Sequence, residues 1–98
     1  MVYMQKVSGS NREHKVQVYT LSTCGWCKKM KALLKKLDVE YEYEDIDLLQ
    51  GEEAERVRNE MRKYNPRISA PTLVIDEGKE VVIGFDEEKV RRCLGFAK

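Results

Sequence analysis

The chain has 98 residues, of which 42% are hydrophobic and 36% are charged. This composition fits one small globular domain and excludes general disorder. The formal net charge is only +1, which gives no electrostatic case for binding nucleic acid or a membrane surface.

Residues 1–15 show no sustained hydrophobic period and contain the short polar run Ser8–Asn11. We interpret them as an N-terminal extension that is either flexible, an added edge element or partly vector-derived. The first four residues are mostly apolar, but Gln5 and Lys6 follow at once. No signal peptide or membrane-spanning run is therefore expected, and a cytoplasmic location follows by default.

The domain begins with a strand and a helix. Val16–Leu21 carries apolar side chains on both faces, which predicts a largely covered strand. From Cys27 onward apolar residues recur at three- and four-residue intervals, which predicts a helix over about residues 25–37. These apolar positions are Met30, Leu33, Leu34 and Leu37. Lysines occupy its other faces, either as a solvated surface or as an attraction for acidic partners.

The remaining elements complete an α/β pattern. Tyr41–Ile46 predicts a second strand, and a second helix is predicted to end at Asn65-Pro66. The apolar stripe of this helix is Ala54, Val57, Met61 and Tyr64. Thr72–Ile75 and Glu80–Ile83 predict a hairpin, followed by a helix that Asp86 caps. The order β-α-β-α-β-β-α predicts a four-stranded mixed sheet with helices on both faces.

Two cysteines separated by two residues, Cys24 and Cys27, follow the first strand of the domain. This spacing makes disulfide exchange the leading interpretation, because a thiolate at a helix N-terminus is stabilised by free backbone N–H groups. Cys27 lies on or beside the core stripe of the helix, whereas Cys24 precedes its first turn. We therefore expect Cys24 to attack and Cys27 to resolve, with a redox-active disulfide and no bound cofactor.

Two other interpretations of the cysteine pair are a zinc site and a pair of buried, unreactive thiols. A zinc site would need further ligands, and only Cys93 and His14 remain, so we expect no metal. Two buried, inert cysteines are the other alternative. Cys93 fits the apolar stripe of the last helix and is expected to pack in the core, and we assign His14 no role.

Thr23–Cys27, Ser69–Pro71 and Ile83–Asp86 occur in an order that resembles the thioredoxin superfamily. Within it, the sequence is similar to the glutaredoxins and the glutaredoxin-like redoxins that serve ribonucleotide reductase. We accordingly divide the chain into an extension, residues 1–15, and a glutaredoxin-like domain, residues 16–98. The resemblance implies a thioredoxin-like fold and a thiol-disulfide oxidoreductase activity.

The resemblance also implies a substrate-binding surface around the dithiol. In the family a cis proline faces the dithiol, so Pro71 is expected to support Ala70 while the backbone of Ala70 pairs with an extended substrate. Asp86 and Arg67 are implied as ligand contacts, and a simple helix cap is the alternative role of Asp86. The predicted substrate-binding residues are Gly25, Trp26, Arg67, Ala70, Pro71 and Asp86.

Two positions depart from the family pattern. Glutaredoxins usually carry Lys or Arg three residues before the first cysteine, where it binds a glutathione carboxylate, and this chain has Leu21. The dipeptide between the cysteines is Gly25-Trp26 in place of Pro-Tyr, and Trp26 either contacts partner proteins or packs against the domain.

These departures favour a dithiol oxidoreductase that reduces protein disulfides, with ribonucleotide reductase as a candidate substrate. Separately, we expect the protein to be a monomer. Glutathione or a disulfide reductase would supply the electrons. A glutathione-dependent glutaredoxin is the alternative. A carrier of a glutathione-assisted 2Fe–2S cluster is less favoured, because that assembly needs only one cysteine per chain and a good glutathione site.

Overall fold

The structure, a computed structural model, describes residues 4–96. Residues 1–3 and 97–98, at the ends of the predicted extension and domain, lie outside the described part. The strands are β1 (Gln5–Val7), β2 (Val16–Thr20), β3 (Tyr41–Asp45), β4 (Thr72–Ile75) and β5 (Glu80–Ile83). The α-helices are α1 (Gly25–Lys36), α2 (Gly51–Arg62) and α3 (Glu87–Cys93), and two short 3-10 turns are η1 (Ile46–Leu48) and η2 (Asp76–Gly78).

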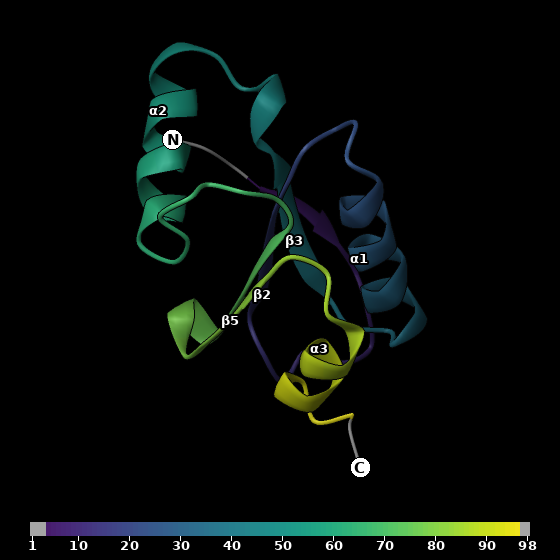
Figure 1. The fold of residues 1–98 in the computed structure, drawn as a ribbon. Helices are drawn as coiled ribbons and strands as arrows, with labels where there is room; N and C mark the ends of the chain where they lie inside the picture. Colours follow the sequence, from purple (N-terminus) through teal and green to yellow (C-terminus); the bar gives the residue numbers. More distant parts are fainter. Residues whose placement is uncertain (1–3, 97–98) are drawn as a thin grey trace.

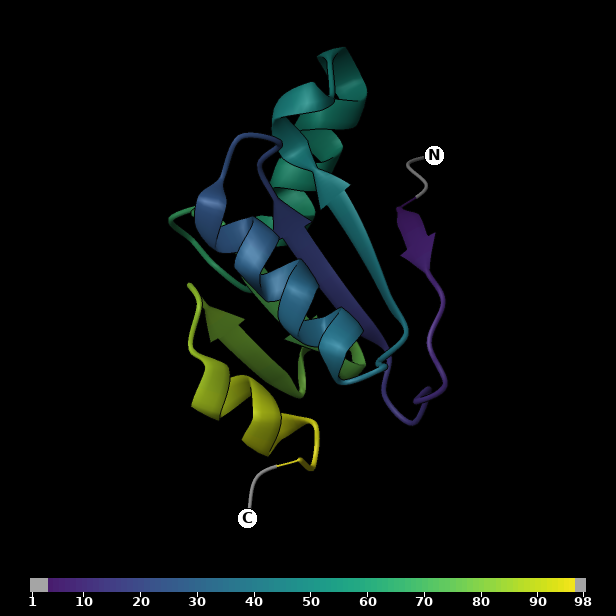
Figure 2. The same ribbon diagram turned by 90° about the vertical axis from the view of Figure 1, so that its right-hand side faces the viewer.

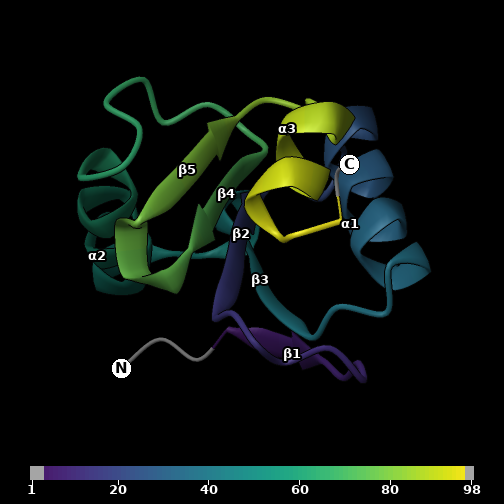
Figure 3. The same ribbon diagram turned by 90° about the horizontal axis from the view of Figure 1, so that it is seen from below.

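Figure 1 shows the fold. The strands form one mixed sheet in the order β1-β3-β2-β4-β5, and all five are labelled in Figure 3. β2 pairs in parallel with β3 and antiparallel with β4, so Val18 lies between Tyr43 and Leu73. The predicted element order and mixed sheet are confirmed. The predicted count of four strands is wrong, because β1 adds a fifth strand antiparallel to β3, with Lys6 opposite Glu42.

The chain between β1 and β2 is packed along the same edge. Gly9 lies so near the start of β3 that an added Cβ would come within 2.6 Å of the backbone nitrogen of Glu40. Asn11 bridges this edge, because its N–H donates to the carbonyl of Asp38 and its carbonyl accepts from Glu40, both at 2.9 Å. Only glycine fits at position 9, so this contact constrains the path of the extension.

Helices cover both faces of the sheet, with α1 and α3 on one side and α2 on the other (Figures 2 and 3). The strands alternate between these faces: Val18 and Leu73 belong to the core under α1 and α3, whereas Tyr19 and Val74 belong to the core under α2. β2 is therefore buried on both sides, as its doubly apolar sequence predicts. Among the described residues, no helix is long and apolar enough to cross a membrane.

Candidate active site

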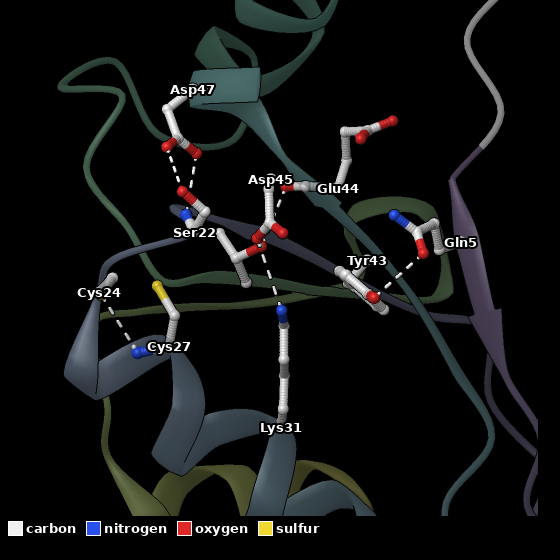
Figure 4. A network of polar contacts seen from close by, with 10 residues as sticks. Gln5, Ser22, Cys24, Cys27, Lys31, Tyr43, Glu44, Asp45 and Asp47 are labelled. Carbon is white, nitrogen blue, oxygen red and sulfur yellow. Dashed lines mark hydrogen bonds and ion pairs between the residues drawn. The ribbon is translucent and has the colours of Figure 1, made fainter. Parts of the chain in front are cut away.

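The dithiol lies where β2 gives way to α1. Cys24 is the N-cap of α1, with extended backbone angles (φ −84°, ψ 117°), and its Sγ accepts a hydrogen bond from the N–H of Cys27 at 3.2 Å (Figure 4). The N–H of Cys24 donates to the carbonyl of Leu21 at 3.1 Å, which closes the turn that precedes the helix. Cys24 is partly exposed, whereas Cys27 is only 1% exposed. Both thiols are free.

Burial makes the Cys27 thiol less acidic. It raises the pKa of Cys27 to about 12, and the hydrogen bond with Cys24 acts in the same direction. The Leu21 backbone and the Lys31 charge act in the opposite direction and do not cancel the effect. Cys27 is therefore a protonated thiol at neutral pH and must lose its proton before it can attack a disulfide.

A cluster of polar side chains lies behind Cys27, one helical turn along α1. The Nζ of Lys31 is 3.4 Å from Oδ1 of Asp45, at the end of β3, and 3.8 Å from the ring centroid of Tyr43. Thr20, at the end of β2, donates to the same carboxylate, and the Tyr43 hydroxyl donates to Gln5 of β1 at 3.1 Å. Figure 4 shows Lys31 extending from α1 toward the ends of the strands. The cluster thus ties α1 to the sheet beside the buried thiol.

The loop before the dithiol is tethered separately. The N–H of Ser22 donates to Oδ1 of Asp47 at 2.8 Å, and its hydroxyl donates to Oδ2 of the same carboxylate (Figure 4). These bonds lower the pKa of Asp47. The side chain of Leu21, where glutaredoxins usually carry a basic residue, is half-buried and packs against the core under α2. The position therefore presents an apolar side chain.

The predicted substrate loop is joined to the turn before α3. The Ala70–Pro71 peptide bond is cis, and the carbonyl of Pro71 accepts the N–H of Gly84 at 2.8 Å. Pro71 is buried and Ala70 is half-buried. Phe85, the next residue after Gly84, stacks on Trp26 with ring centroids 6.0 Å apart. These two contacts bring the Pro71 loop and the start of α3 to the end of the sheet that carries the dithiol.

Trp26 packs against the domain and is also largely exposed. It packs against Phe85 at an interplanar angle of 26°, and the Nζ of Lys29 lies 4.6 Å from its ring centroid. It nevertheless remains 58% exposed. Its neighbour Gly25 is also exposed, with open space where a Cβ would stand. The surface beside Cys24 is therefore an ordered aromatic side chain next to unobstructed backbone.

The two polar substrate-binding candidates are less closely tied to the dithiol. Asp86 is exposed and its carboxylate accepts the N–H of Lys89 at 3.1 Å, which is the helix-cap role. Arg67 is exposed in the loop that leads to Pro71, and its backbone N–H donates to Oδ1 of Asn65. Cys93 is half-buried at the margin of the core, with its Sγ 3.6 Å from a carboxylate oxygen of Glu80. The prediction that it packs in the core interior is thus only partly right.

The sequence predicts Asn65 only as a helix stop, yet its side chain organises the loop over residues 65–71. It is 1% exposed, and its amide Nδ2 lies 2.9 Å from both Ser69 Oγ and Thr72 Oγ1 and 3.2 Å from the Ser69 carbonyl. Its Oδ1 accepts the N–H of Arg67 at 3.1 Å. The loop residue Ile68 has a positive φ of 51°, which such bonds help to hold. The signal in the sequence is an asparagine just before a proline at a helix end.

Within residues 4–96, no group of three or more His, Cys, Asp or Glu side chains is arranged to hold a metal ion. Fold and site together define a thioredoxin-like protein with a paired dithiol at the N-terminus of its first α-helix. Comparison with known proteins identifies one family within that class.

The glutaredoxin family model matches residues 16–81. The structure resembles a glutaredoxin from Methanosarcina mazei, with a TM-score of 0.86 and 42% identity over 97% of this chain and 90% of that one. It also resembles methanoredoxin from Methanosarcina acetivorans, with a TM-score of 0.83 and 40% identity over 90% of each chain. A monothiol glutaredoxin of Caenorhabditis elegans is 32% identical over 86% of this chain, which spans 56% of that protein's length.

The chain belongs to the glutaredoxin family, whose members are thiol-disulfide oxidoreductases. The resemblance inferred from the three motifs is thereby confirmed.

Proposed function

We propose that this protein is a dithiol oxidoreductase that reduces disulfides in other proteins, with Cys24 as the attacking and Cys27 as the resolving cysteine. The observation that carries the proposal is the asymmetry of the pair. Cys24 is partly exposed at the helix N-terminus and receives the N–H of Cys27, whereas Cys27 is buried and its pKa is raised to about 12.

The proposed reaction has two exchange steps. The Cys24 thiolate attacks one sulfur of the substrate disulfide, a Cys24–substrate disulfide forms, and the other substrate sulfur leaves as a thiolate that takes a proton. Cys27 then loses its proton and attacks the Cys24 sulfur, which releases the second substrate thiol. The substrate gains two electrons, and the protein is left with a Cys24–Cys27 disulfide that an external reductant must reduce.

Lys31 supports the second step in this proposal. Its positive charge acts on the buried thiol and lowers the pKa of Cys27 relative to burial alone. The Lys31 ammonium group is held in place by its ion pair with Asp45, at 3.4 Å, and by its position over the Tyr43 ring. Lys31 is thus a positioned charge that stabilises the Cys27 thiolate as it forms.

We further propose that protein disulfides are preferred over glutathione. A basic side chain three residues before Cys24 would bind a glutathione carboxylate, and Leu21 instead packs its side chain against the α2 core. The exposed Trp26 and the accessible backbone at Gly25 favour a protein surface as the partner. A dithiol that must be kept reduced also favours a reducing compartment such as the cytoplasm.

Trapping tests the assignment. Cys27→Ser is expected to accumulate a stable mixed disulfide with a disulfide-bonded protein substrate, and Cys24→Ser is expected neither to react nor to trap. Cys93→Ser is the matched control and is expected to turn over normally. Faster alkylation of Cys27 than of Cys24 would reverse the two roles.

The same assay identifies the reaction partners. Ribonucleotide reductase is the first protein substrate to test, and regeneration is compared with glutathione and with a disulfide reductase.

A further inference from the structure

We propose that the groove between α1 and α3 binds an acidic segment of the protein whose disulfide is reduced, with one apolar side chain of that segment inserted against Phe85. The proposal rests on the proposed function, since it supplies a docking site for the same substrate. The groove is shallow and open to solvent, with a volume of about 340 Å³. Its lining residues are Lys29, Ala32, Leu33, Lys36, Phe85 and Glu87.

The groove lies next to Trp26, the residue that immediately precedes Cys27 in the sequence. Two of its lining residues contact Trp26. The Nζ of Lys29 lies 4.6 Å from the Trp26 ring centroid, and the ring centroid of Phe85 lies 6.0 Å from it. Trp26 itself lies between the two cysteines. α1 and α3 lie side by side on one face of the sheet (Figure 3). A peptide segment bound between them would therefore run past Trp26 toward Cys24. The groove is thus placed to hold chain that flanks a substrate disulfide.

The charge of the groove is positive and available. Lys29 and Lys36 are exposed and two turns apart on α1, and within residues 4–96 neither forms an ion pair. Glu87, the acidic residue of the lining, is bonded to Arg91 at 2.9 Å. The chain as a whole carries only +1, so this charge is a local feature. The two lysine charges complement carboxylates that are carried a few residues apart on a short peptide.

The walls of the groove are partly apolar, so it can bind an apolar side chain as well as carboxylates. Phe85 is half-buried, Ala32 is exposed, and the side chain of Leu33 closes the floor. Lysine stems add further apolar contact while their ammonium groups stay in water. The volume is at the lower end of the range for ligand pockets, which suits one or two inserted side chains. A leucine or phenylalanine among acidic residues has the chemistry that this surface accepts.

A matched pair of charge reversals tests the groove. Lys36→Glu changes a lining residue, and Lys35→Glu makes the same charge change on the same exposed helical turn outside the lining. Both positions lie in the last turn of α1, so effects on helix stability are equal. The probes are three synthetic peptides that carry the same intramolecular disulfide followed by Asp-Glu-Leu-Asp-Glu, Asp-Glu-Ala-Asp-Glu or Asn-Gln-Leu-Asn-Gln.

For the wild-type protein we expect KM to be lowest for the acidic leucine peptide. Lys36→Glu is expected to raise that KM roughly three- to tenfold while kcat is unchanged, and Lys35→Glu to raise it less than twofold. Replacement of leucine by alanine in the peptide is expected to raise KM several-fold in the wild-type protein. The preference for acidic over amide peptide is expected to fall as salt is added.

Equal effects of Lys35→Glu and Lys36→Glu would overturn the groove and leave only a diffuse attraction by the helix. Equal KM values for the acidic and amide peptides would refute the proposal that the bound segment is acidic. Competition by single-stranded DNA as effective as that of the acidic leucine peptide would overturn a peptide-specific site. Failure of the wild-type protein to reduce any of the three disulfides would instead refute the proposed function, so the two failures are distinguishable.

Discussion

Removal of the Asn65 side chain is expected to release the loop that carries Pro71. The amide has two N–H groups for three acceptors, at 2.9, 2.9 and 3.2 Å, and its oxygen accepts the Arg67 N–H. Asn65→Ala therefore loses about three hydrogen bonds, each with a net contribution of roughly 1 kcal/mol, and leaves a small buried cavity. We expect the free energy of unfolding to fall by about 2 to 4 kcal/mol.

Urea titration of the reduced protein, followed by circular dichroism, measures this loss. Asn59→Ala is the control, because Asn59 is exposed and bonded to Arg62 within the same helix, and it is expected to change stability by less than about 0.5 kcal/mol. Kinetics separate positioning from stability: at temperatures where the Asn65 variant is folded, we expect a higher KM for a disulfide peptide and an unchanged alkylation rate of Cys24. A loss below about 1 kcal/mol, or an unchanged KM, would refute the role of Asn65.

Three further predictions concern the thiols. The pKa of Cys27 is about 12 in the folded chain against 9.0 for an unburied thiol, so the unfolded chain loses a proton first and stability falls as pH rises above 9. At pH 10 the loss from this thiol is on the order of 1 kcal/mol; urea titration at pH 8 and 10 checks it, and the same pH dependence in Cys27→Ser would contradict it. Lys31→Met is expected to raise the pKa of Cys27 further and to accumulate mixed disulfide at neutral pH, measured by acid quench and mass spectrometry, whereas Lys31→Arg is expected to behave as wild type. Leu21→Lys is expected to raise turnover of glutathione mixed disulfides roughly tenfold or more, and Arg67→Ala to remove most of the wild-type activity on them; wild-type turnover equal to that of protein disulfides would contradict both.

The local elements were predictable because their signals are local. The strand at Val16 and the helix after Cys24 follow from their patterns of apolar side chains, and the structure places both within a residue of their predicted bounds. The hairpin from Thr72 to Ile83 likewise needed only two apolar runs and a glycine-containing turn. The Cys24–Cys27 pair was recognisable because its chemistry depends on spacing along the chain.

Features that depend on distant contacts are not determined by local sequence. An added edge element is one of three alternatives for residues 1–15, because β1 has three residues and no hydrophobic period, and it is a strand only because Lys6 and its neighbours pair with β3. Asn65 and Asp47 resemble ordinary helix-end and turn residues, and their roles depend on Thr72 and Ser22, which the fold brings near them. No pattern within one element contains that information.

The placement of β1 on β3 also bears on how these molecules behave in crowded solution. The outer edge of a sheet presents unpaired N–H and C=O groups, to which a strand from a neighbouring molecule can add. β1 occupies that edge of β3 over Tyr41–Tyr43, and it is short with Lys6 at its centre. Deletion of residues 1–10 would uncover a tyrosine-bearing strand, so intermolecular pairing and precipitation are the consequences to expect. We therefore expect residues 4–10 to limit strand pairing between molecules, a role distinct from the thiol chemistry at the end of β2.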